Sequence, residues 1–296
     1  MFKLILKGIV LGFSNAIPGV SAGTMALIMG IYDKMLKSID ELFTSKEYRF
    51  KSLRFLVLIG IGVVIGGLFC ASILTWIFSI SFLETLTFIF IIGLVLGSIP
   101  MIFKLNEDMK PTFFRVFLLF LACSLAVLLS IQEQSPTENL MDNAIQSSFL
   151  GIFNITTFRI QDALKFLFLG AVTSATMIIP GISGSALLVS LGEYQNILNV
   201  ISQRLLIQGI FFALGILLGI VTCAKAISWL IKKYPSKTYY FIIGLLGSSI
   251  FQVSISTNWT NVLSPVLIAI SIILLLCGFL LSFNLGKIKE KREDSL

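Results

Sequence analysis

Two short segments of the chain carry a proline, a glycine and, two residues after the glycine, a serine. They are 18–21 (Pro-Gly-Val-Ser) and 180–183 (Pro-Gly-Ile-Ser). Proline lacks a backbone N–H and disfavours a helical residue before it, so a helix that reaches either segment is broken there. A helix that restarts after the break has free N–H groups and a partial positive charge at its first turn. Both segments are therefore candidate anion-binding sites.

Small and hydroxyl-bearing residues surround both breaks. Hydroxyl groups can replace the hydration of an anion's oxygens, and glycines allow the backbone to approach it closely. A lysine inside an apolar span is costly and often functional, but it can also extend its charge to the membrane surface. The candidate ligands are Asn15, Gly19, Ser21, Gly23, Thr24, Gly181, Ser183, Gly184, Ser185 and Lys225. Serine, threonine and glycine also serve close packing of membrane helices, so each has that alternative role.

The composition excludes a soluble fold and several kinds of chemistry. Of 296 residues, 56% are apolar and 12% are charged, against about 25% charged in soluble domains. No histidine is present, which excludes histidine-dependent hydrolysis and histidine-ligated metals. The four cysteines have no CxxC spacing, so we expect no metal site. We likewise expect no cofactor and no enzymatic activity.

Six apolar runs are long enough to cross a membrane as helices. We predict spans at about 53–80, 82–103, 113–131, 205–231, 239–255 and 262–283. Two further apolar segments, 3–31 and 165–192, are each broken by Pro-Gly into halves of about 10–14 residues, roughly half a bilayer. GxxxG spacings at Gly62–Gly66, Gly93–Gly97 and Gly215–Gly219 predict packing faces inside the protein.

The two halves of the chain resemble each other. The broken segments align at an offset of 162, which places Lys3 on Lys165 and Tyr32 on Tyr194. We therefore predict an all-α polytopic membrane protein with two repeats. The predicted units are repeat 1 (1–131), an external connecting loop (132–163), repeat 2 (164–284) and a basic cytoplasmic tail (285–296).

The positive charges favour one topology of these repeats. The net charge is +7, and it lies in short loops between apolar runs, where it sets orientation and does not indicate nucleic-acid binding. If each broken segment is a re-entrant hairpin, eighteen Lys and Arg lie inside and three outside, whereas full crossing would give ten and eleven. The re-entrant arrangement gives each repeat three crossings, so the second repeat is inverted and both termini are cytoplasmic.

Inverted repeats with discontinuous helices at mid-membrane are typical of transporters. The residues alone thus predict a transporter for an anion, with one repeat rocking against the other. Alternatives are a transporter or channel for a small soluble anion, a lipid phosphatase, which the missing histidines disfavour, and an assembly partner without transport activity.

Two motifs also resemble those of a known family. Residues 15–27 (Asn-Ala-Ile-Pro-Gly-Val-Ser-Ala-Gly-Thr-Met-Ala-Leu), with Gly-Ile-Tyr-Asp at 30–33, resemble the first signature of the polyprenyl-phosphate translocases of the PopT type. Residues 179–185 and 192–194 resemble the second. The resemblance implies that undecaprenyl phosphate moves from the outer to the inner leaflet of the bacterial cell membrane, for lipid-carrier recycling in cell-wall synthesis. It implies polyprenyl phosphate and membrane lipids as partners, and it leaves the coupling ion open.

Overall fold

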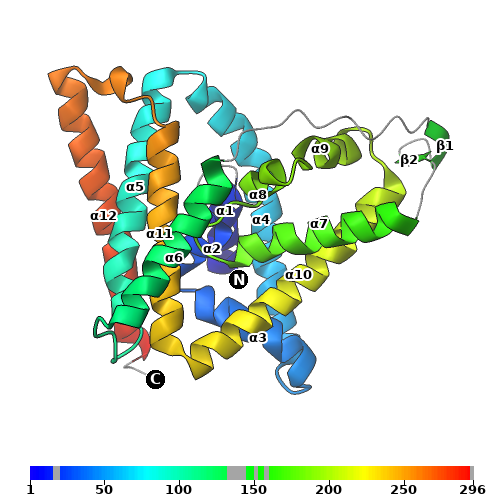
Figure 1. Cartoon of the computed structure of the whole chain (residues 1–296), viewed down its shortest axis with the longest axis horizontal. Coiled ribbons are helices and arrows are strands. Elements are labelled where there is room, and N and C mark those ends of the chain that lie inside the picture. The colour runs from blue at the N-terminus through cyan, green and yellow to red at the C-terminus, as the bar shows by residue number, and fades with distance from the viewer. Residues whose placement is uncertain (16–20, 132–144, 150–152, 157–159, 294–296) are drawn as a thin grey trace.

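The computed structural model describes residues 1–15, 21–131, 145–149, 153–156 and 160–293. Its two halves contain helices in the same order, joined by a segment with two short strands (Figure 1). The first half contains α1 (Phe2–Asn15), α2 (Ala22–Ile28), α3 (Tyr32–Thr44), α4 (Arg49–Phe78), α5 (Ser81–Phe103) and α6 (Phe113–Ile131). The second contains α7 (Ile160–Ile178), α8 (Gly184–Ser190), α9 (Tyr194–Ser202), α10 (Leu206–Lys233), α11 (Pro235–Ser256), the 3-10 helix η1 (Trp259–Val262) and α12 (Pro265–Glu293).

All six predicted spans are helices. Five of them, α4, α5, α10, α11 and α12, contain a stretch that is long and apolar enough to cross a membrane. In α6 the apolar stretch is shorter, Phe113–Leu128. The prediction of a helical membrane protein is therefore confirmed.

Both broken segments are interrupted where the Pro-Gly pairs predict. Helix α1 ends at Asn15 and α2 begins at Ala22, whereas α7 ends at Ile178 and α8 begins at Gly184. The second half of each broken segment forms a short helical arm, α2 or α8. Each arm has seven residues, fewer than the roughly 10–14 expected. Each arm is followed by a glycine with positive φ, Gly30 at 63° and Gly192 at 71°, a conformation that ends a helix.

Helices α3 and α9 follow these turns, in regions where the apolar pattern predicts no membrane span. In α3 the residues Met35, Leu36 and Ile39 are buried, and charged residues occupy the other face. This spacing is the pattern of an amphipathic helix, which contains no long apolar run.

The helices pack in pairs both within and across the two halves. Helix α1 packs on α4 and α7 on α10, whereas α5 packs on α12 and α6 on α11. The predicted GxxxG faces are inside the protein: a Cβ on Gly62 would lie 2.2 Å from the carbonyl oxygen of Ile5, and one on Gly93 would lie 2.2 Å from that of Leu275. These contacts bring helix backbones together without intervening side chains.

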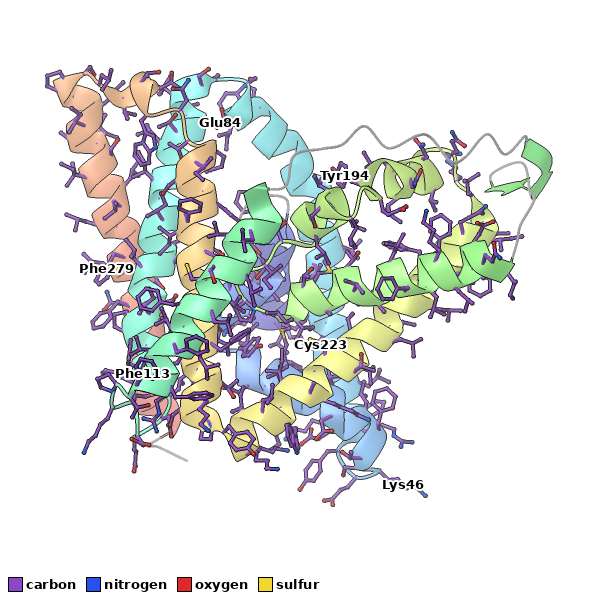
Figure 2. The ribbon with its side chains drawn as sticks, viewed as in Figure 1. Lys46, Glu84, Phe113, Tyr194, Cys223 and Phe279 are labelled. Atoms are coloured by element: carbon purple, nitrogen blue, oxygen red, sulfur yellow. The ribbon has the colours of Figure 1, made fainter. Side chains whose placement is uncertain are left out.

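Several basic connections gather at one end of the molecule, which we call the basic end. It comprises residues 34–54, 104–115 and 232–237. Lys46 and Phe113 lie at this end and Glu84 lies at the opposite one (Figure 2). Two contacts join its parts: Lys232 Nζ lies 3.9 Å from a carboxylate oxygen of Asp40, and Asn106 Nδ2 donates to Ser236 Oγ at 2.8 Å. Helix α4 starts at this end, whereas its counterpart α10 terminates there.

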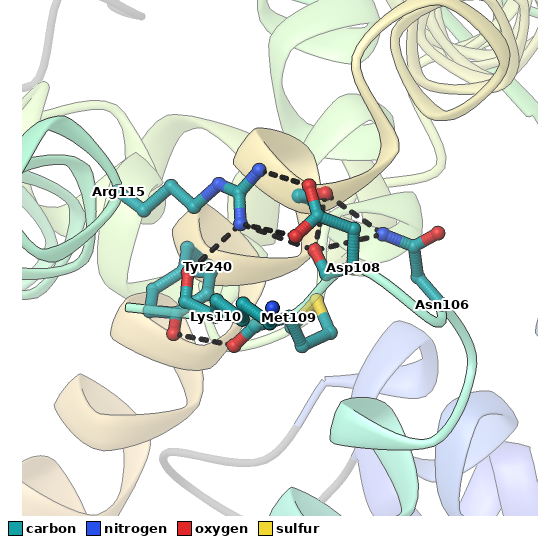
Figure 3. Close-up of polar contacts among 7 residues, drawn as sticks. Asn106, Asp108, Met109, Lys110, Arg115 and Tyr240 are labelled. Atoms are coloured by element: carbon teal, nitrogen blue, oxygen red, sulfur yellow. Dashed lines mark hydrogen bonds and ion pairs between the residues drawn. The ribbon is translucent and has the colours of Figure 1, made fainter. Parts of the chain in front are cut away.

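The connection between α5 and α6 is fixed to α11 by polar contacts (Figure 3). Ser236 Oγ donates to the carbonyl oxygen of Asp108 at 2.6 Å, and the Tyr240 hydroxyl donates to that of Met109 at 3.0 Å. Arg115 pairs with the Asp108 carboxylate and donates to the Lys110 carbonyl oxygen at 2.8 Å. These bonds satisfy the backbone of a turn that has no regular structure of its own.

The connecting segment corrects one expectation. We expected all-α structure with a plain loop at 132–163, but β1 (Ile145–Phe149) and β2 (Phe153–Thr156) pair there as antiparallel strands. A polar connection that leaves the helical core must satisfy its own backbone groups, and pairing two strands does so locally. Residues 132–144, 150–152 and 157–159 lie outside the described ranges.

Candidate functional site

The short helix α2 lies at the centre of the molecule. All seven of its residues are buried, and it contacts α1, α3, α5, α7 and α12. A helix of this length spans about 10 Å and is not stable alone. Its surroundings therefore hold it in place, and its first turn lies within protein.

Ser21 caps this helix. Its backbone is extended, with φ −102° and ψ 155°, and its Oγ accepts a hydrogen bond from the backbone N–H of Thr24 at 3.1 Å. This is the usual way in which serine satisfies a free N–H at the start of a helix. Ser21 Oγ and Thr24 Oγ1 lie 3.1 Å apart, and the two residues are only 3% and 0% exposed.

The two Pro-Gly breaks meet at these hydroxyls. The backbone N–H of Gly181 donates to Thr24 Oγ1 at 2.9 Å and to Ser21 Oγ at 3.3 Å. In return, Ser21 Oγ lies 3.3 Å from the carbonyl oxygen of Ile179, to which it donates. Segments about 160 residues apart in the chain are thus joined by polar contacts in the buried centre. We call Ser21, Thr24 and Gly181 the central cluster.

Glycine is required at two positions of this contact. Gly181 has φ +88°, and a Cβ there would lie 2.2 Å from the carbonyl oxygen of Leu245. A Cβ on Gly23 would lie 2.6 Å from the carbonyl oxygen of Ile178. In this structure the close approach at these glycines is to other parts of the backbone, and a close approach to an anion stays a prediction.

The second break is less enclosed than the first. Ser183 precedes α8 with an extended backbone, but its side chain makes no capping hydrogen bond, and Ser183 and Gly184 are half-buried. A Cβ on Gly184 would lie 3.0 Å from Thr176 Oγ1, so α8 packs closely on α7. The two breaks are similar in sequence but differ in how far protein covers them.

The remaining predicted residues have different positions. Asn15 ends α1 and Ser185 lies in α8, but neither side chain belongs to the described part of the structure, and Gly19 lies in the undescribed range 16–20. Lys225 is exposed on α10, with its Nζ 4.9 Å from the centre of the Phe43 ring of α3. Its cation–π contact is with α3, and not with the central cluster.

Sequence reasoning missed one residue beside this cluster. Ser248 of α11 is buried, and its Oγ lies 3.3 Å from the carbonyl oxygen of Gly181 and 2.7 Å from that of Leu245. It lies in a continuous apolar span and is not part of a duplicated motif, so nothing in the sequence distinguishes it from a packing residue.

Comparison with known proteins places this chain in a family. Residues 11–266 match the undecaprenyl phosphate translocase-like family. The chain belongs to this family. It is 28% identical to a polyprenyl-phosphate transporter of Staphylococcus aureus, over 98% of this chain and 97% of the relative. It is 30% identical to a polyprenyl-phosphate transporter of Vibrio cholerae, over 81% of this chain and 73% of the relative. No solved structure matches the chain.

Proposed function

We propose that this protein moves polyprenyl phosphate, with undecaprenyl phosphate as the expected substrate, between the leaflets of the bacterial cell membrane. The observation that carries the proposal is the buried contact between the two Pro-Gly breaks, where Thr24 and Ser21 bind the Gly181 N–H. Membership of a translocase-like family and two relatives named polyprenyl-phosphate transporters support the choice of substrate. The activity breaks no covalent bond, so the protein is proposed to be a flippase and not an enzyme.

The central cluster offers polar groups that would lower the cost of moving a charged head group through the membrane. A phosphate head carries between about one and two negative charges, and placing a charge at mid-bilayer costs several kcal/mol. Hydroxyls and backbone N–H groups around the breaks offer polar contacts at that depth. In the conformation described, the cluster's groups satisfy each other, so the head group would exchange these contacts for its own, while the apolar tail stays in lipid.

We further propose that the two halves are inverted repeats and that the broken segments are re-entrant. The opposite directions of α4 and α10 relative to the basic end support inversion. The complete burial of α2 supports an arm that enters the protein interior. With the basic end in the cytoplasm, the positive-inside rule is obeyed and both termini are cytoplasmic. One repeat would then rock against the other to expose the site alternately.

Net transfer is proposed to run from the outer to the inner leaflet, which returns the spent carrier to cell-wall synthesis. The test is a leaflet-resolved assay of undecaprenyl phosphate in proteoliposomes with and without the protein. We expect Ser21→Ala combined with Ser183→Ala to slow transfer by about tenfold or more, since each change removes a hydroxyl worth about 1 kcal/mol.

A matched control is Ser98→Ala. Ser98 is 1% exposed and donates to the Val95 carbonyl oxygen of its own helix at 2.7 Å. This variant should transfer lipid at the wild-type rate. An unchanged rate in the Ser21/Ser183 variant would show that the site is misplaced. Flux of inorganic phosphate from vesicles without polyprenyl lipid would instead favour a soluble-anion transporter.

A further inference from the structure

A second polar site lies at the basic end, outside the central cluster. It is a cavity of about 1040 Å³ between the start of α1, the helix α3 and the start of α4. Its lining includes apolar residues of α1 and α4, namely Leu4, Phe55 and Leu58, opposite charged residues of α3. Because α4 begins its apolar span at Arg49, the cavity lies at the level where the membrane surface meets water.

Positive charge dominates the lining. Four cationic side chains, Lys34, Lys37, Lys51 and Arg54, face two carboxylates, Asp33 and Glu41. Glu41 is already engaged, because Ser52 Oγ donates to one of its oxygens and Lys37 Nζ lies 3.8 Å from the other. The side chains of the lining thus have an excess of two positive charges, which matches the charge of a phosphate monoester.

One cation is held by the apolar wall. Lys34 Nζ lies 4.9 Å from the centre of the Phe55 ring, a cation–π contact that fixes the ammonium group beside apolar surface. Arg54 precedes Phe55 in α4 and also lines the cavity, and a guanidinium can bind two phosphate oxygens at once. A ligand that combines a phosphate with an apolar chain would satisfy both surfaces.

We infer that this cavity binds the phosphate monoester head of an isoprenoid lipid at the membrane surface. It would be a binding site separate from the central cluster. The lipid identity rests on the proposed function, whereas the recognition of a phosphate monoester rests on the cavity itself. Its volume exceeds that of a bare phosphate ion and leaves room for the first isoprene units along Phe55 and Leu58. The cavity reaches Asp33 in the first turn of α3, and α2, which contacts α3, begins at the central cluster.

The test measures binding to the purified full-length protein in lipid nanodiscs. The probes are a short-chain isoprenyl monophosphate, inorganic phosphate and the corresponding isoprenyl alcohol. Lys51→Gln combined with Arg54→Gln should weaken binding of the monophosphate by about tenfold or more, through loss of two charge-assisted contacts. Inorganic phosphate should bind more weakly than the monophosphate and should show the same loss, whereas the alcohol should be unaffected.

The control is Lys46→Gln combined with Lys110→Gln, which removes two exposed charges from the basic end but not from the lining. Equal affinity of the monophosphate for the two double variants overturns the inference, whatever the transfer assay shows. Equal affinity of the wild type for inorganic phosphate and for the monophosphate overturns the lipid assignment. A wild-type protein that binds the monophosphate at the cavity but transfers no lipid between leaflets contradicts the proposed function alone.

Discussion

At the residue scale, Gly181 joins the two breaks through three kinds of constraint. Its N–H donates to the hydroxyls of Ser21 and Thr24, its carbonyl oxygen accepts from Ser248, and its φ of +88° lies in the region that favours glycine. No other residue type meets all three conditions without strain. The sequence motif predicts the glycine, whereas its bonding partners become known only from the tertiary contacts.

We expect Gly181→Ala to destabilise the protein by about 2–5 kcal/mol. About 1–2 kcal/mol comes from the left-handed backbone conformation, and about 1–3 kcal/mol from the overlap of the new Cβ with the backbone of Leu245. The measurement is thermal unfolding in detergent. Gly60→Ala is the control, because its Cβ would have no neighbour within 4 Å, and alanine is the better helix former by about 0.5–1 kcal/mol. Equal destabilisation by both changes would contradict the contact at Leu245.

At the element scale, the connection between α5 and α6 is anchored by an ion pair that depends on pH. The Arg115 guanidinium, which donates hydrogen bonds to the Asp108 carboxylate, lowers the pKa of Asp108 from its ordinary value of 3.8. A carboxylate with a depressed folded-state pKa stabilises the fold above its ordinary pKa. That contribution is lost as the pH falls through the folded-state value.

Asp108→Asn should therefore remove part of the acid sensitivity of the fold. The wild-type Tm should fall as the pH is lowered below about 4, and the variant should show a shallower decline from a slightly lower starting value. Thermal melts from about pH 3 to pH 7 measure this. The effect is small because Asp108 is solvent-exposed. Parallel curves for the two proteins would show that Asp108 makes no pH-dependent contribution.

The elements themselves were predictable to different degrees. The six long helices follow from continuous apolar runs, and the breaks follow from proline chemistry at Pro18 and Pro180. The lengths of α2 and α8 did not follow, because Gly30 and Gly192 end these arms through backbone angles that an apolar count does not register. The pairing of α5 with α12 could not be predicted either. A glycine face such as the one at Gly93 predicts close packing but does not specify which helix packs there.

At the scale of the whole molecule, the contacts between the two halves are not symmetric. Helix α3 packs on α10, where Asp40 lies near Lys232 and Phe43 lies under Lys225. Among the described residues, the counterparts α9 and α4 share no comparable interface. In the alternating cycle proposed above, this asymmetry is what one state of the cycle would show, with the basic end closed and its counterpart open.

Holding α3 against α10 should stop transport. In a cysteine-free background, Asp40→Cys and Lys232→Cys joined by a cleavable thiol-reactive linker should abolish lipid transfer, and cleavage should restore it. Lys165→Cys and Glu193→Cys form the control, because their ion pair, 2.7 Å long, lies within the second half. This pair should tolerate the linker. Undiminished transfer with α3 and α10 linked would contradict movement at this interface.

The pairing of α5 with α12 and of α6 with α11 has a consequence for biogenesis. When the ribosome has released α5 into the bilayer, the helix that covers Gly93 and Gly97 has not yet been made. That surface must stay in contact with lipid until the final helix is inserted. Neither half can therefore reach its final packing alone. A chain that ends before Pro265 would leave the glycine face of α5 uncovered, and quality-control proteases could recognise it.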